Sequence, residues 1–260
     1  MLGNYEEFKK EIYKLNQIDL NSYKERQMKR RIDALISKKG FASYMDFVKS
    51  IGANRESLEE FTTYLTINVS EFYRNPEQWS ILEKDILPEL FASKGKKLKI
   101  WSAACSTGDE PYSLVMLLSK YIPLDNIQII ATDLDLQVLE KAKSGLYHEK
   151  YLRGIPEEFV HKYFEQVDPK TYRLSEKIRR CVQFKQHDLL KDEYPKDCDL
   201  IICRNVMIYF TEEAKNIIYE KFYNSIYKNG FLFVGSTEQM IQSVKLGFLS
   251  YKSFFYRKIN

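Results

Sequence analysis

Two acidic residues stand where a predicted strand turns into a predicted helix. The stretch KIWSAACSTGDEPYSLVMLL, residues 99–118, passes from an apolar segment through small residues into a helical pattern that begins at Asp109 and Glu110. A loop that binds a pyrophosphate is rich in glycine and presents the phosphate to the helix N-terminus. This turn contains one glycine, Gly108, and its two carboxylates would repel a phosphate. We therefore expect a ligand that is neutral or positively charged at this point.

Further acids follow later strands. Asp133 ends IQIIATD, 25 residues after Gly108, near the spacing at which a carboxylate binds ribose hydroxyls, and Asp188 follows another short strand in KQHDLL. S-adenosylmethionine fits this set because it has an adenosine, a sulfonium and an ammonium group but no phosphate. Taken singly, Glu110 also suits the positive end of a helix dipole, and Asp133 also suits a helix cap. Their occurrence after successive strands favours cofactor binding.

The elements that must position these acids alternate between strand and helix from Lys99 onward. Buried apolar strands joined by amphipathic helices predict an α/β fold with a doubly wound, mostly parallel sheet. The strands are expected in LKIWSAA, IQIIATD, CDLIICRNV and GFLFVGSTE, and the tail FLSYKSFFYRKI is expected to form a last strand. The rhythm breaks at about residues 150–185, where TYRLSEKIRRCVQFKQ predicts a small antiparallel β insertion.

The N-terminal third has a different pattern. Residues 1–93 show apolar positions at spacings of three and four, which predicts an all-helical domain. One of these helices is expected to begin near Asn21 or Ser22 and to end at Gly40. The segment KGKKLK resembles a linker, so we expect domains at 1–93 and 94–260, the second being a Rossmann-like domain with the β insertion.

Composition excludes several classes of protein. The 260 residues carry a net charge of +4, too small to indicate nucleic-acid binding, and no apolar run approaches the roughly 20 residues of a membrane span. The four cysteines form no CxxC pair and the three histidines have no metal-ligand spacing. We expect a reduced, cytoplasmic, metal-free protein in which Cys203 is a packed core thiol.

The chain resembles the CheR family, the chemotaxis receptor methyltransferases. The resemblance covers nearly the whole chain and rests on four stretches in order, with GSTE at 235–238 in addition: TINVSEFYRNP at 66–76, WSAACSTGDEPYS at 101–113, ATDLDLQVLEKAKSGLY at 131–147 and CRNVMIYF at 203–210. It implies an S-adenosylmethionine-dependent methyltransferase that esterifies glutamate side chains of bacterial chemoreceptors and releases S-adenosylhomocysteine. The CRNVMIY stretch also lacks the Asn/Asp-Pro-Pro-aromatic motif of enzymes that methylate exocyclic amines.

The resemblance also implies roles for matching positions. Glu110 resembles the ligand of the methionine amino group and Asp133 the ribose ligand, while Asn68, Ser70 and Arg74 resemble residues that close over the cofactor. Tyr209 follows a strand beside the expected position of the transferred methyl, so from their chemistry we expect the Tyr209 hydroxyl or Arg74 to orient the substrate carboxylate. Arg74 as a surface salt bridge and Tyr209 as core packing are the alternatives. The other positions expected to contact the cofactor are Asn68, Ser70, Arg74, Ala103, Asp188, Leu189, Arg204 and Asn205.

A basic stretch offers a means of substrate recognition. Residues 21–40 contain seven Lys or Arg and two acids, and Arg26, Lys29 and Arg30 fall together on one helical face. This face suits docking of acidic receptor helices, with a solvated surface as the alternative. No aromatic residues are interleaved for base stacking, so a nucleic-acid partner is not expected.

Two further expectations concern partners. Some members of the family bind a receptor C-terminal pentapeptide through a glycine-rich loop, whereas the corresponding turn here is the short EQVDPKT at 165–171. We therefore expect no tight pentapeptide tether. We also expect no membrane insertion and a monomer.

The rival functions are a methyltransferase for a small molecule or nucleic acid, and a non-catalytic module that binds the cofactor and regulates a partner.

Overall fold

The computed structural model describes residues 2–259, which divide into two compact units. The helical unit comprises residues up to 68 together with 206–217, and the sheet unit comprises residues 69–205 and 218 onward. The segment between residues 69 and 93 thus groups with the sheet, which differs from the boundary expected near residue 93. The physical reason is packing, because Trp79, Leu82 and Ile86 are buried in the apolar core of the sheet unit.

The helical unit is built from amphipathic helices whose apolar stripes meet in an aromatic core. Phe8, Phe47 and Phe61 are fully buried there, and Phe61 contacts both of the others edge to face. Side chains of Asn4, Ser43 and Asn54 cap three of the helices, each by accepting a backbone N–H of the first turn. The helices are α1 (Tyr5–Asn16), α2 (Glu25–Lys38), α3 (Tyr44–Gly52) and α4 (Arg55–Thr66).

Helix α2 begins later than the pattern predicts, because the residues before it make other hydrogen bonds. Leu20–Ser22 forms a short 3-10 turn, η1, and Tyr23 forms an isolated antiparallel bridge with Phe210. Lys24 N–H donates to the Tyr209 carbonyl at 2.8 Å, and Thr211 N–H donates to the Ser22 carbonyl at 2.9 Å. These bonds explain why residues 206–217 belong to the helical unit.

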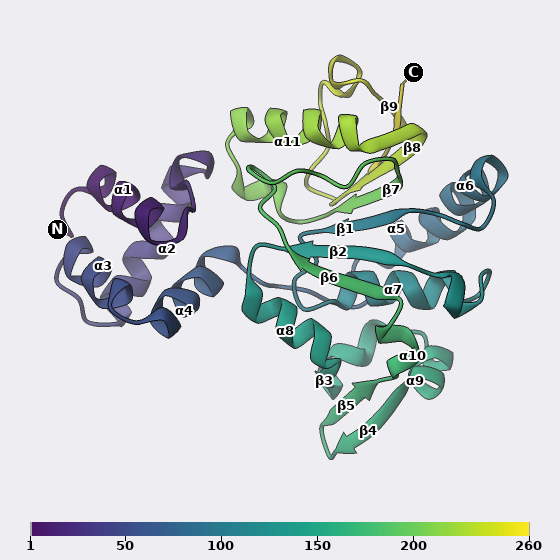
Figure 1. The fold of residues 1–260 in the computed structure, drawn as a ribbon, viewed down its shortest axis with the longest axis horizontal. Helices are drawn as coiled ribbons and strands as arrows, with labels where there is room; N and C mark the ends of the chain where they lie inside the picture. Colours follow the sequence, from purple (N-terminus) through teal and green to yellow (C-terminus); the bar gives the residue numbers. More distant parts are fainter. Residues whose placement is uncertain (1, 260) are drawn as a thin grey trace. The chain divides into compact units, whose positions relative to one another are not determined.

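The sheet unit holds a seven-stranded sheet in the order β6-β2-β1-β7-β8-β10-β9 (Figure 1). The first five strands in that order are parallel, β10 pairs antiparallel with β8, and the edge strand β9 pairs antiparallel with β10. This arrangement confirms the predicted Rossmann-like α/β fold. The strands are β1 (Ile100–Ala103), β2 (Ile129–Asp133), β6 (Val182–Gln186), β7 (Cys198–Cys203), β8 (Ile226–Val234), β9 (Phe248–Lys252) and β10 (Phe255–Lys258).

The helices of this unit follow the predicted pattern. Crossover helices follow β1 and β2, and Figure 1 shows α8 beside the edge of the sheet that β6 forms. The segment before β1 contains one π-helical stretch, η2, between two α-helical pieces. The helices are α5 (Pro76–Ile81), η2 (Leu82–Ile86), α6 (Leu87–Lys94), α7 (Asp109–Leu118), η3 (Leu124–Asn126), α8 (Leu136–Ser144), α9 (Glu157–Tyr163) and α10 (Glu176–Arg179), with α11 (Glu212–Ser225) crossing from one unit to the other.

The predicted antiparallel insertion is present as a three-stranded sheet in the order β3-β5-β4. Its strands are β3 (Leu146–His148), β4 (Phe164–Asp168) and β5 (Thr171–Leu174). Two details differ from expectation. VQFKQ leaves the insertion and forms β6, since its residues pair in parallel with β2, and the C-terminal tail forms the hairpin β9–β10 instead of one strand.

Candidate functional site

The predicted site residues of the sheet unit gather at the carboxyl ends of three adjacent strands. In the sheet register Ala103, the last residue of β1, pairs with Thr132 on one side and Cys203 on the other. Asp133, the last residue of β2, and Arg204, which directly follows β7, each stand one position further along, so both lie at this edge of the sheet. Ligands in open α/β sheets bind outside the carboxyl ends of the strands.

The loop after β1 is tightly wound. Ala104 and Ser106 have left-handed backbone angles, with φ of 61° and 49°, and Gly108 has φ of 86°. A Cβ at Gly108 would lie 2.9 Å from the Ala142 Cβ, which explains the single glycine of the turn. The buried Ser106 hydroxyl has no hydrogen-bond partner among residues 2–259, so the loop leaves one polar atom available to a ligand.

Asp133 is held beside this loop and is not the cap of the following helix. Its Oδ2 accepts from Ser106 N–H at 2.8 Å and its Oδ1 accepts from Asp135 N–H at 3.0 Å, while Asp135 itself caps α8. Burial raises the pKa of Asp133 to about 6, and these backbone donors oppose the shift. With Leu134, three backbone groups donate to this carboxylate, which leaves it capacity for a further hydrogen bond from a ligand that donates hydroxyl groups.

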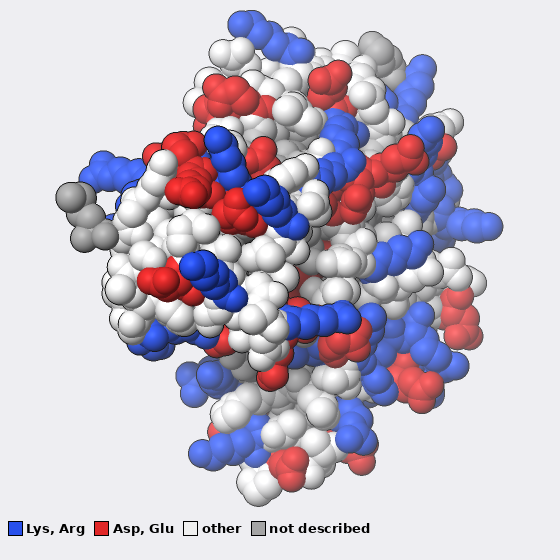
Figure 2. Space-filling view, turned by 60° about the vertical axis from the view of Figure 1, so that its left-hand side comes forward, with Lys and Arg blue, Asp and Glu red and all other residues white. Residues whose placement is uncertain are grey.

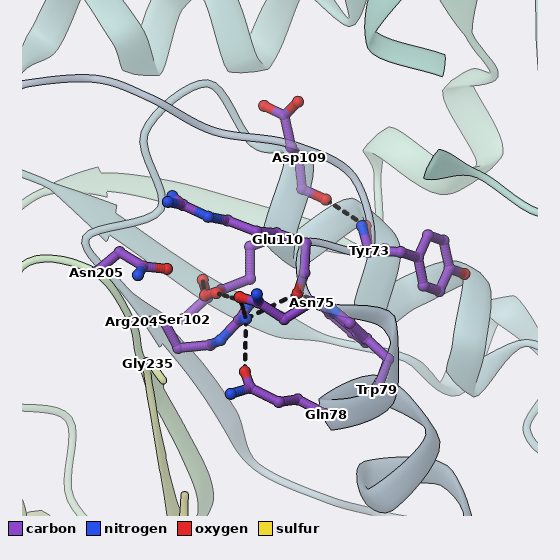
Figure 3. Close-up of polar contacts among 12 residues, drawn as sticks. Tyr73, Asn75, Gln78, Trp79, Ser102, Asp109, Glu110, Arg204, Asn205 and Gly235 are labelled. Carbon is purple, nitrogen blue, oxygen red and sulfur yellow. Dashed lines mark hydrogen bonds and ion pairs between the residues drawn. The ribbon is translucent and has the colours of Figure 1, made fainter. Parts of the chain in front are cut away.

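Glu110 lies in the first turn of α7, and its carboxylate is bonded at both oxygens. Ser102 Oγ donates to Oε1 at 2.8 Å, and the Arg204 guanidinium lies 3.4 Å from Oε2 (Figure 3). Burial raises the pKa of Glu110, while Arg204 and the Ser102 hydroxyl oppose this shift. A paired carboxylate in this position has capacity left to accept from an ammonium group.

Arg204 is the centre of a buried polar network and is only 7% exposed. One terminal nitrogen, Nη2, lies 2.8 Å from the Arg74 carbonyl, 3.0 Å from Asn75 Oδ1 and 2.8 Å from Gln78 Oε1 (Figure 3). Asn75 has a left-handed backbone with φ of 60°. Arg204 therefore holds a strained turn before α5 against the end of β7, in addition to pairing with Glu110.

Asp109 and Ser70 make a second, internal set of contacts. Asp109 is 1% exposed, and Thr107 Oγ1 donates to its Oδ2 at 2.5 Å. Burial raises its pKa, whereas hydrogen bonds from Thr107 and Ser70 lower it. Ser113 Oγ bridges the Asp109 carbonyl and Tyr73 N–H, so these residues attach the segment before α5 to α7.

The positions expected near the adenine follow β6. Asp188 is partly exposed, and its Oδ1 accepts from Leu190 N–H at 2.8 Å. Leu189 is buried, and its carbonyl accepts from Lys221 Nζ at 3.3 Å. Asp188 therefore shapes a turn and retains a second carboxylate oxygen that can accept from an amino group.

Asn68 and Arg74, both expected to contact the cofactor, are assigned to different compact units. Asn68 ends the helical unit, where its Nδ2 donates to Thr66 Oγ1 at 2.9 Å. Arg74 belongs to the sheet unit and donates from Nη1 to the Val69 carbonyl at 3.1 Å. Their joint action on a cofactor stays a prediction.

Tyr209 and the basic helix α2 lie in the same unit. Lys24, whose N–H bonds the Tyr209 carbonyl, is the residue before α2, and Arg26 and Arg30 are exposed on that helix. Lys29 differs from them because it pairs with Asp33 at 2.8 Å, and this bond raises its pKa to about 12. Figure 2 shows basic and acidic side chains interspersed over the face that it presents.

Several residues of this network are not among those predicted from the sequence. Ser102 is a polar residue within an otherwise apolar strand, which is a recognisable signal. Asn75 and Gln78 gave no such signal, since their function depends on a contact with Arg204 some 130 residues away in the chain. Glu238 lies in the quoted GSTE stretch and binds Asn205 N–H at 2.7 Å.

The described residues offer neither a cluster of metal ligands nor a membrane-spanning helix. Within residues 2–259, no group of three or more His, Cys, Asp or Glu side chains could hold a metal ion. No helix in the described part of the chain is long and apolar enough to cross a membrane. The four cysteines are buried free thiols, and burial raises the pKa of Cys203 well above its usual value.

Comparison with known proteins yields matches over most of the chain. A family model described as CheR methyltransferase, all-alpha domain, matches residues 3–66, and one described as CheR methyltransferase, SAM binding domain, matches residues 68–254. The chemotaxis protein methyltransferase of Listeria monocytogenes is 42% identical over 93% of this chain and 92% of its own length. Chemotaxis protein methyltransferase 1 of Pseudomonas aeruginosa is 33% identical over 92% of this chain and 90% of its own. The corresponding protein of Borreliella burgdorferi is 30% identical, with 87% and 84% covered.

Proposed function

The chain belongs to the CheR methyltransferase family and is an S-adenosylmethionine-dependent methyltransferase of chemotaxis, and from this premise we propose that it methylates glutamate side chains of bacterial chemoreceptors. The product would be a γ-glutamyl methyl ester on the cytoplasmic helices of the receptor. The observation that carries the choice of substrate is the hydrogen bond from Lys24 N–H to the Tyr209 carbonyl. It joins an exposed basic helix, suited to an acidic protein, to the segment that carries Tyr209.

The residues present fit S-adenosylmethionine. Glu110 would accept from the ammonium group and Asp133 from the ribose hydroxyls, with Asp188 and Leu189 on the adenine side. The Ser106 hydroxyl, which has no hydrogen-bond partner among residues 2–259, and the closely wound loop after Ala103 are consistent with a ligand seated there. When bound, this cofactor supplies an electrophilic methyl group on a sulfonium.

A glutamate carboxylate is ionised at neutral pH, so the chain needs no general base for this substrate. What it must provide is orientation and a site that excludes water, since water stabilises separated charges more than a transition state in which they neutralise each other. We assign orientation of the carboxylate to Arg74 and Tyr209, and assign Asn68, Ser70 and Asn205 to holding the cofactor.

These assignments have a direct test in two substitutions. Arg74→Ala and Tyr209→Phe are each expected to lower turnover at least about tenfold, the effect of losing one hydrogen bond of roughly 1.4 kcal/mol in the transition state. Thermal unfolding should change little, because Arg74 donates one exposed hydrogen bond and Phe retains the ring of Tyr209. Wild-type turnover in both variants would remove the assignments.

The reaction itself is tested with cofactor radiolabelled in the methyl group. Incubation with membranes that contain chemoreceptors should label the receptors, and mild alkali should release the label as methanol, because carboxyl esters are base-labile. Membranes without receptors are the control. A label that resists alkali would place the methyl on nitrogen or carbon and contradict the proposal, as would labelling of small molecules or nucleic acid alone.

We also propose that the receptor is held without a tight C-terminal tether. The connection between β4 and β5 consists of Pro169 and Lys170, which gives no extended loop beside the small sheet. Calorimetry with a receptor C-terminal pentapeptide should show no binding at micromolar concentration. Saturation in that range would contradict this part of the proposal.

A further inference from the structure

One buried carboxylate near the site has no role in the function proposed above. Glu238 lies in the loop after β8 and is 5% exposed. A single oxygen, Oε2, accepts from Gly235 N–H at 2.8 Å and from Asn205 N–H at 2.7 Å. Gly235 and Asn205 follow β8 and β7, which are neighbouring parallel strands with Cys203 paired to Val234. Glu238 thus joins two loops at the edge of the sheet where the candidate site lies.

Both loops have a geometry that depends on this contact. Asn205 has a left-handed backbone with φ of 61°, a conformation that side chains other than glycine adopt at a cost. At position 235 a Cβ would lie 2.4 Å from Glu238 Oε2 and 2.9 Å from the Asn205 nitrogen. Only glycine therefore lets the carboxylate approach both amides, which makes Gly235 and Glu238 one unit.

The contact acts next to the polar network of the cofactor site. Asn205 follows Arg204, whose guanidinium pairs with Glu110, and Figure 3 draws Asn205 and Gly235 beside Arg204. The chain leaves the sheet unit directly after Asn205 and enters the segment that carries Tyr209. A residue that fixes the backbone of Asn205 therefore also fixes the loop that carries Arg204.

We propose that Glu238 is a positioning residue for methyl transfer, which holds the loops after β7 and β8 together so that Arg204 and Asn205 are set for the cofactor. This inference rests on the proposed role of Glu110 and Asn205 in cofactor binding. It does not depend on the identity of the methyl acceptor. A purely structural Glu238 would affect unfolding but leave cofactor affinity and turnover of the folded enzyme unchanged.

The test is a double-mutant cycle between Glu238 and Gly235. Glu238→Gln keeps the size of the side chain but replaces the charged acceptor, and Gly235→Ala inserts the Cβ that displaces the carboxylate. Each single variant should weaken S-adenosylmethionine binding in calorimetry by about tenfold and lower kcat, with the receptor KM unchanged. The double variant should be no worse than the more impaired single variant, because both changes break the same contact.

Two matched variants control for charge and for the loop. Glu220→Gln removes an exposed carboxylate of α11, and Gln239→Ala changes the exposed neighbour of Glu238. Both should bind the cofactor as the wild type does.

In Glu238→Gln the amide protons of Asn205 and Gly235 should exchange faster with solvent, because they lose a charged acceptor. If this variant does not fold, Gly235→Ala carries the same measurements.

Wild-type cofactor affinity and turnover in folded Glu238→Gln would overturn the inference, and so would single effects that add in the double variant. The titration uses cofactor and enzyme alone. A wild-type enzyme that labels no receptor, combined with a variant that binds the cofactor weakly, would refute the proposed substrate and leave the positioning role supported.

Discussion

Arg204 of the sheet unit and Arg26 and Arg30 of the helical unit carry the same functional group in opposite surroundings. Arg204 is 7% exposed, and its guanidinium contacts Glu110, Asn75, Gln78 and the Arg74 carbonyl. Arg26 and Arg30 stand exposed on α2. A buried guanidinium is fixed by its partners and is costly to leave unpaired, whereas an exposed one is mobile and screened by salt.

This difference assigns different tasks to the two regions. The buried network determines where backbone and carboxylates stand, so changes to it should appear in cofactor affinity, turnover and stability. The exposed face of α2 acts on a partner that is still approaching, so changes there should appear in the KM for the receptor and in its salt dependence. Substitutions in each region test whether these effects are separate.

The largest effect is expected from Arg204→Leu. The change leaves the Glu110 carboxylate and the buried Gln78 oxygen without their partner, and breaking a buried ion pair costs about 3–5 kcal/mol. Denaturant unfolding should show a loss of this size, together with loss of methyl transfer. Arg204→Lys keeps a charge but not the planar donor set, so its free energy of unfolding and its methyl transfer should lie between those of Arg204→Leu and the wild type. An Arg204→Leu protein of wild-type stability would contradict the network.

The next effect concerns pH and Asp133, whose buried carboxyl has a pKa raised to about 6. In the unfolded chain this pKa is about 3.9, so the native state retains a proton that the unfolded state has lost between about pH 4 and pH 6. The free energy of unfolding of the ligand-free protein should therefore fall across that range as pH rises, by at most about 3 kcal/mol from this group.

Cofactor affinity should change in the opposite direction, because a carboxylate accepts ribose hydroxyls better than a carboxylic acid does. Calorimetry should show S-adenosylmethionine affinity rising as the pH increases through about 6, which is the pKa of Asp133. Asp133→Asn should flatten both pH profiles. Profiles that keep their slopes in this variant would assign the titration to another group.

The smallest effect is expected on α2. Charge reversal in Arg26→Glu/Arg30→Glu should raise the KM for the receptor several-fold at low salt, with kcat and cofactor affinity near the wild-type values. Reversal of Lys10 and Lys49, which are exposed on α1 and α3, is the matched control. Unchanged KM in the α2 variant, or an equal rise in the control, would leave the basic face as ordinary solvated surface.

The sequence predicts the sheet, its small antiparallel insertion and the acids Glu110 and Asp133, because these depend on local patterns. Alternation of apolar strands and helices indicates the fold, and a carboxylate directly after a strand indicates the edge of the sheet where it lies. Local patterns do not predict the unit boundary at residue 68 or the hydrogen bonds of Arg204. Both depend on packing between segments far apart in the chain, such as Trp79 against Phe233 of β8.

The most direct test of the account is a calorimetric titration of S-adenosylmethionine into three proteins: the wild type, Glu110→Gln and Arg26→Glu/Arg30→Glu. Glu110→Gln should bind roughly 10- to 150-fold more weakly, since a hydrogen bond to a charged group is worth about 1.5–3 kcal/mol. The α2 variant should bind as the wild type does. Equal affinity of Glu110→Gln and the wild type would contradict the central claim that the buried carboxylate of α7, paired with Arg204, holds the cofactor.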